Sequence, residues 1–232
     1  MKWLYLLIDI CTVIVPFVFS FHPRLCFYQS FKAFFAASVI TSIFFIAWDI
    51  LFTRLKVWGF NPKYISGIYF FGLPIEEVLF FICIPFACVF TYHCFTKFFN
   101  LQWKIKTRNA YVLILCTLLL ITGIFNYNKL YTSSTFISLA LVLVALNFFI
   151  KVSWLDKLLI IYPVLLIPFF IVNGILTGTG LHQPVVWYND HQNLGLRLFT
   201  IPVEDIFYGF ELILLNIFLY EFFKRKFKNI MK

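Results

Sequence analysis

The chain has 232 residues, of which 62% are hydrophobic, 22% aromatic and only 12% charged, and its mean hydropathy is +0.91. A soluble domain carries about twice that charged fraction, so composition excludes an ordinary soluble protein and indicates an integral membrane protein. The net charge is +9. Its basic residues lie between apolar segments and at the C-terminus, a pattern that sets membrane topology and argues against nucleic-acid binding. The six cysteines form no C-x-x-C pair, so neither a disulfide framework nor a zinc site is indicated.

Seven apolar segments are predicted to form helices that cross the bilayer. They cover residues 3–21, 31–52, 67–92, 110–125, 135–150, 154–176 and 198–220. No small-x-small cleavage site follows the first segment, so we expect a retained helix and not a signal peptide. No polar linker divides the chain, and we therefore expect one all-α, polytopic membrane domain over residues 1–232.

The basic residues are distributed unevenly between the two sets of loops. With seven spans, thirteen of the 19 lysines and arginines fall on the face that holds the C-terminal tail, and six fall on the opposite face. The positive-inside bias predicts a protein of the cell membrane with its C-terminus in the cytoplasm and its N-terminus outside.

A short acidic motif occurs twice, as Pro74-x-Glu76-Glu77 and Pro202-x-Glu204-Asp205. Flanking residues repeat at the same offset of about 128 residues, which indicates an internal duplication. The aligned positions include Gly67 with Gly195, Phe71 with Phe199, and Phe60-Asn61 with Tyr188-Asn189. Farther upstream, residues 49–53 match residues 173–177 at an offset of 124. We predict two parallel three-helix copies, about residues 1–97 and 131–224, joined by a linker helix at about 109–126 and related by an axis along the membrane normal.

Both motifs place two adjacent acids at the start of a predicted helix. Proline suits a first helical turn, and negative charge is favoured there, so simple helix-start chemistry is the alternative explanation. An ionisable residue inside a membrane span costs about 2.5–3.5 kcal/mol and is a functional candidate. Neighbouring carboxyl groups tend to divide into one protonated and one ionised member, as acid–base catalysis requires. The catalytic candidates are therefore Glu76, Glu77, Glu204 and Asp205, and the sequence does not say which is acid and which is base.

Weaker signals surround the motifs. Asp49 either joins the acidic cluster or sits at the interface, Asn173 is a hydrogen-bonding residue, and Arg197 is either a counter-ion or a loop cation. Aromatic residues near the motifs are candidates to line a pocket for a carbocation through cation–π attraction: Trp58, Phe71, Phe80, Tyr188, Phe199 and Tyr208. His182 and His191 have no third ligand at metal spacing, so we predict no metal site.

These motifs resemble the membrane-integral lycopene cyclases, which occur as two-subunit enzymes, as single chains and as fungal fusions. The likeness covers nearly the whole chain. It is carried by Trp-x-Phe/Tyr-Asn, by Leu73-Pro74-Ile-Glu76-Glu77 with Phe80-Phe81, and by Ile201-Pro202-Val-Glu204-Asp205 with Tyr208. The resemblance implies β-cyclisation of the ψ-ends of lycopene to β-ionone rings, giving γ- or β-carotene without net redox change. Without a G-x-G-x-x-G fingerprint, no flavin and no other cofactor is expected.

The resemblance further implies that both copies build one site, so we expect the two acid pairs to face one cavity. The expected partners are a carotenoid substrate within the bilayer and possible associations with other carotenoid-synthesis enzymes. Candidate substrate-binding residues are Asp49, Trp58, Phe60, Asn61, Phe80, Asn173, Tyr188, Asn189, Arg197 and Tyr208.

Three other functions are alternatives to cyclisation for a membrane protein of this kind. Small transporters also contain parallel three-helix repeats, and a carotenoid hydratase would trap the same cation with water. A prenyltransferase would need a D-x-x-x-D motif, which the chain lacks. The sequence leaves open whether one or both ends react, whether C50 substrates are used, and the oligomeric state.

Overall fold

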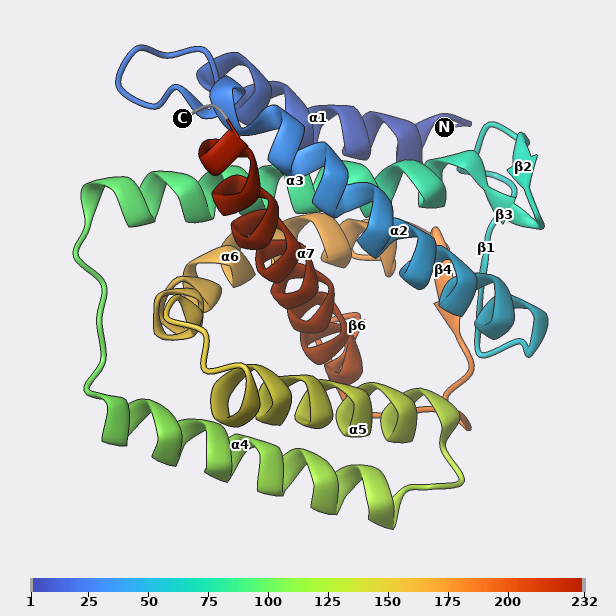
Figure 1. The fold of residues 1–232 in the computed structure, drawn as a ribbon. Helices are drawn as coiled ribbons and strands as arrows, with labels where there is room; N and C mark the ends of the chain where they lie inside the picture. Colours follow the sequence, from blue (N-terminus) through green and yellow to red (C-terminus); the bar gives the residue numbers. More distant parts are fainter. Residues whose placement is uncertain (1, 231–232) are drawn as a thin grey trace.

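A computed structural model describes residues 2–230, which form a bundle of seven α-helices (Figure 1). The helices are α1 (Leu4–Phe19), α2 (Phe31–Arg54), α3 (Ile75–Phe98), α4 (Ile105–Phe125), α5 (Leu130–Val144), α6 (Leu155–Leu176) and α7 (Val203–Ile230). The predicted all-α class and the number of helices are confirmed. Six helical segments are long and apolar enough to cross a membrane, whereas α1, with 16 residues, is shorter. Lys232, the last residue of the basic tail, lies outside the described residues.

The two acidic motifs start their helices later than the sequence predicted. Residues 67–74 form a hairpin of β2 (Tyr69–Phe70) and β3 (Leu73–Pro74) ahead of α3. Phe71 and Gly72 at its turn have φ values of +51° and +92°, a left-handed conformation that an α-helix cannot contain. The predicted start at residue 67 is therefore wrong.

The same correction applies before α7. There β5 (Arg197–Leu198) and β6 (Ile201–Pro202) form a second hairpin, with Phe199 at φ +58°. The predicted start at residue 198 is therefore also wrong. Both prolines lie directly before a helix, and both acid pairs lie in a first helical turn.

A third strand pair joins segments that are far apart in the sequence. β1 (Trp58–Phe60) runs antiparallel to β4 (Val186–Tyr188), with Gly59 opposite Trp187. A Cβ atom on Gly59 would lie 2.4 Å from the Trp187 ring, so this close approach requires glycine. The pair links the α2–α3 and α6–α7 connections across one end of the bundle (Figure 1).

The order helix, helix, strand, hairpin, helix occurs on both sides of α4. This is the order that the predicted copies would have, and the axis that would relate them stays a prediction. α7 passes through the middle of the bundle between α2 and α5, and α4 lies outside against α5 (Figure 1). α5 starts at Leu130, five residues before the predicted start, and ends in a π-helical turn, Ala145–Phe149.

Candidate active site

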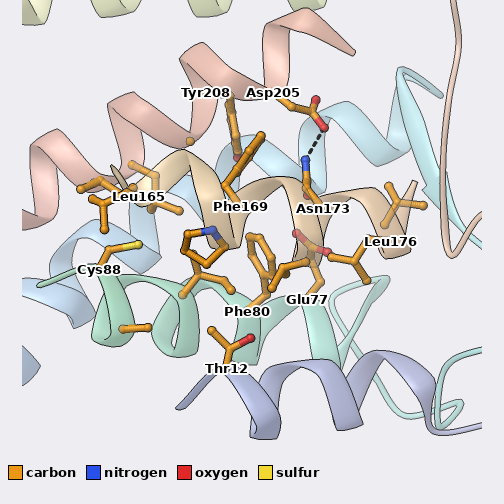
Figure 2. Close-up of a pocket in the computed structure, with 18 of the residues that line it drawn as sticks. Thr12, Glu77, Phe80, Cys88, Leu165, Phe169, Asn173, Leu176, Asp205 and Tyr208 are labelled. Carbon is orange, nitrogen blue, oxygen red and sulfur yellow. Dashed lines mark hydrogen bonds between the residues drawn. The ribbon is translucent and has the colours of Figure 1, made fainter. Parts of the chain in front are cut away.

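A cavity of about 130 Å³ lies among α3, α6 and α7 (Figure 2). At one end it is lined by three carboxyl groups, those of Asp49, Glu77 and Asp205, and no lysine, arginine or histidine among residues 2–230 lines it. Along α3 its lining extends from Glu77 to Thr91, which at 1.5 Å per residue is about 21 Å. The site is therefore an elongated channel with acids at one end and mainly apolar walls beyond.

The structure separates the two members of each acid pair. Glu77 and Asp205 line the cavity, whereas Glu76 and Glu204 do not, although both are fully buried. Adjacent residues on an α-helix point about 100° apart, so only one member of each pair can face the channel. We expected both acid pairs to face one cavity, but the structure places only the second acid of each pair there.

The first acid of each pair instead holds the loop that precedes its hairpin. Glu76 accepts a hydrogen bond from the Ser66 backbone N–H at 2.6 Å. Glu204 accepts one from the Leu194 N–H at 2.7 Å and another from the Thr132 hydroxyl at 2.6 Å. In both cases the backbone donor lies ten residues before the acid. Through these contacts Glu76 and Glu204 each serve to hold the preceding loop in place.

We expect Glu204→Ala to destabilise the fold and Glu204→Gln to do so much less. Alanine leaves the Leu194 N–H and the Thr132 hydroxyl without their acceptor, and each unsatisfied buried donor costs about 1–3 kcal/mol. Glutamine retains an acceptor oxygen in the same place. The measurement is the thermal unfolding midpoint of each purified variant in detergent. Equal midpoints for the alanine and glutamine variants would contradict this role.

Asp205 is the most extensively hydrogen-bonded carboxyl group of the channel. Its Oδ1 accepts from the Tyr131 hydroxyl at 2.7 Å. Its Oδ2 accepts from the Tyr188 hydroxyl at 2.9 Å. The same oxygen accepts from Asn173 Nδ2 at 2.8 Å (Figure 2). Burial is the main cause that raises the pKa of Tyr188 well above its usual value, and the nearby Asp205 carboxyl group adds to the effect. This phenol therefore remains a neutral donor.

The other two channel carboxyl groups have fewer partners. Glu77 accepts a hydrogen bond from the Tyr5 hydroxyl, and Asp49 accepts one from Trp58 Nε1. The second oxygen of Asp49 and the hydroxyl of Tyr208 are buried and have no hydrogen-bond partner among the described residues. Polar atoms at this end of the channel are thus free to interact with a bound molecule.

Aromatic rings surround the acidic end. The Trp58 ring lies 5.0 Å from Tyr131 and 5.9 Å from Tyr208, measured between centroids, and Tyr131 stacks on Tyr188 at 6.1 Å. Phe60 and Phe80 complete this part of the lining. The faces of such rings attract positive charge. The channel therefore combines carboxyl groups with a wall suited to a cation.

The structure places seven of the ten predicted substrate-binding residues on the channel. They are Asp49, Trp58, Phe60, Phe80, Asn173, Tyr188 and Tyr208. The other three, Asn61, Asn189 and Arg197, do not line it. The aromatic residues Phe71 and Phe199 also lie elsewhere, at the exposed hairpin tips.

Those three residues outside the channel stabilise the surrounding loops. The backbone N–H of Asn61 donates to Val185 O, and that of Asn189 donates to Val57 O, each at 2.8 Å, beside the β1–β4 pair. Arg197 forms an ion pair with Asp190 at 2.6 Å. Burial acts to raise the pKa of Asp190, but hydrogen bonds from Arg197 and Asn193 outweigh it and leave this pKa below its usual value.

Sequence reasoning missed three phenols that line the channel, those of Tyr5, Tyr131 and Tyr162. Tyr5 and Tyr131 each donate to the channel carboxyl group of their own half. Both lie one residue after the first residue of a helix, α1 or α5. Extending the repeat alignment upstream of residue 49 would have paired them. Among the described residues, no cluster of three His, Cys, Asp or Glu side chains is placed to hold a metal ion.

The fold and the channel define a polytopic helical membrane protein with a buried site suited to acid–base chemistry. The family model described as lycopene cyclase matches residues 2–95 and 128–223. These regions make up most of the chain, which therefore belongs to the lycopene cyclase family. Family membership indicates an enzyme of carotenoid cyclisation that acts on a carotenoid substrate. No curated protein and no solved structure matches the chain significantly.

Proposed function

We propose that this protein is a lycopene β-cyclase, an isomerase that converts the ψ-ends of lycopene into β-ionone rings. The observation that carries the proposal is the pair of carboxyl groups, Glu77 from α3 and Asp205 from α7, at the acidic end of one channel. Cyclisation needs a proton donor and a proton acceptor near one end group. Family membership and the aromatic wall support the same reaction.

The hydrogen bonds support different roles for the two carboxyl groups. Asp205 accepts three of them, and hydrogen bonds to a carboxylate favour its ionised form. Glu77 accepts one, from Tyr5. Burying several like charges without a cation is costly, so at least one channel carboxyl group must carry a proton. We therefore assign Glu77 as the acid and Asp205 as the base.

In the proposed reaction, the Glu77 carboxyl group transfers its proton to C2 of the terminal C1=C2 double bond. The resulting tertiary cation at C1 is attacked by the C5=C6 double bond, so that the C1–C6 bond closes the ring and the positive charge moves to C5. Asp205 then removes the proton from C6, and the C5=C6 double bond of the β-ring forms. One proton enters and one leaves, so the reaction has no net redox change.

The channel walls support the intermediate cation and the rest of the substrate. The rings of Trp58, Tyr131 and Tyr208 surround the acidic end, and their faces stabilise positive charge. Excluding water also protects the cation from being trapped as an alcohol. Beyond the acids, Leu165 and Ile213 are among the apolar residues along the channel, which suits a linear polyene.

The test of the proposal is pigment analysis by chromatography after expression in cells that accumulate lycopene. We expect γ-carotene, β-carotene or both to appear at the expense of lycopene. Hydroxylated products would instead indicate that water traps the cation, as in a hydratase. Unchanged lycopene, with the protein present in the membrane fraction, would contradict the cyclase function of the single chain.

A further inference from the structure

A second cavity, which shares no lining residue with the channel, lies where α5 and α7 end and α6 begins. It is a groove of about 460 Å³, within the roughly 300–1,000 Å³ that is common for small-molecule sites. Lys151, from the connection before α6, and Arg225 and Lys226, from α7, line it. This is the end of the bundle that the charge bias predicts to be cytoplasmic.

The three cations of this groove have no ion-pair partner in the part of the chain that the structure describes. None of them is ion-paired to an acid among residues 2–229, where the salt bridge found joins Arg197 and Asp190. No aspartate or glutamate lines the groove. The nearby Asp156 accepts from the backbone N–H groups of Trp103 and Lys157 and lies outside the lining. The described lining of the groove therefore holds three positive charges and no negative one.

The rest of the groove is largely apolar, and hydrogen bonds hold the connection before α6, which forms one side of it. Trp154, Phe218 and Phe222 contribute to its walls, and Phe222 is 53% exposed. The Val152 N–H donates to Leu146 O at 3.0 Å, and Arg108 Nη1 donates to Val152 O at 3.2 Å. Ser153 and Trp154 also lie at the start of α6, where a helix terminus favours negative charge.

We propose that this groove binds the headgroup of an anionic phospholipid. Its phosphodiester would contact Lys151, Arg225 and Lys226, and the upper parts of its acyl chains would lie against the exposed ring of Phe222. Charge complementarity selects an anion, and the adjoining apolar wall favours a lipid over a free phosphate ion. The inference is independent of the proposed reaction, because no residue of this groove lines the channel.

The test is a binding titration of the purified full-length protein in detergent, followed by native mass spectrometry. The probes are phosphatidylglycerol, phosphatidylcholine and inorganic phosphate. The groove variant is Lys151→Gln/Arg225→Gln/Lys226→Gln. The matched control, Lys32→Gln/Lys104→Gln/Lys106→Gln, removes the same charge from the same end of the bundle. Arg225→Gln alone serves if the triple variant fails to fold.

We expect one phosphatidylglycerol to bind more tightly than phosphatidylcholine. A contribution of about 1 kcal/mol per cation corresponds to about fivefold in affinity, and hence to roughly a hundredfold loss in the groove variant. The matched control should keep affinity close to that of the wild type. Equal losses in both variants, equal binding of the two lipids, or displacement of the lipid by inorganic phosphate would each overturn the proposal.

Discussion

Replacing Glu77 by glutamine, or Asp205 by asparagine, is expected to eliminate detectable ring formation. Each change keeps the shape of the side chain but removes the group that donates or accepts the proton, and such acid–base groups contribute about 10²–10⁴-fold to a reaction rate. The measurement is the amount of cyclised carotenoid in lycopene-accumulating cells, divided by the amount of protein in the membrane fraction.

The neighbouring acid provides a matched control for Glu77. Glu76→Gln makes the same chemical change one residue away, at a position that does not line the channel. Glutamine can still accept the Ser66 N–H, so we expect this variant to retain most of the cyclase activity. If Glu76→Gln were inactive and Glu77→Gln active, the proton donor would be Glu76 and not Glu77.

Replacing Gly209 by phenylalanine is expected to block the channel. Gly209 lines it on α7, and a Cβ atom there would already lie 3.5 Å from the Phe169 ring and 3.8 Å from the Tyr162 hydroxyl. A larger side chain must therefore occupy space that the substrate needs. Even a displacement of about 1 Å can cost roughly 10²-fold, so we expect at least that loss in kcat/KM, measured with membranes and added lycopene.

Gly209→Ala is the control for this blocked variant. Its Cβ atom would make ordinary van der Waals contacts, and alanine favours a helix over glycine by about 1 kcal/mol. The alanine variant should therefore fold well and remain active. The contrary result would be a phenylalanine variant that is present at wild-type levels and cyclises lycopene as fast as the wild type. Such a result would show that the polyene does not lie beside Gly209.

The sequence was sufficient to predict the seven helices and to locate the acids, because both signals are local. Long apolar segments identify spans without reference to their neighbours, and the doubled Pro-x-Glu-Glu/Asp motif points to residues 76–77 and 204–205. Which acid of each pair faces the channel depends on the first residue of the helix and on its rotation. The predicted starts at residues 67 and 198 were wrong because residues 67–74 and 197–202 form hairpins.

Two further features depend on contacts between distant segments. The β1–β4 pair joins residues 58–60 to residues 186–188. The matching dipeptides Phe60-Asn61 and Tyr188-Asn189 gave no sign that these segments would pair with each other. Tyr131 lies just before the predicted fifth span, residues 135–150, so that prediction did not place it in a helix. Because α5 begins at Leu130, Tyr131 lies in its first turn and reaches Asp205.

The peripheral position of α4 has a consequence for how the proposed site is maintained. None of its residues lines the channel, whereas the two proposed catalytic carboxyl groups come from helices on either side of it in the sequence. We infer that α4 acts as a covalent tether between them. A tether replaces the encounter of two separate chains by an intramolecular one, with an effective concentration that short linkers can raise to the millimolar range. Glu77 and Asp205 then come together in every copy of the chain, whatever the concentration of the protein in the membrane.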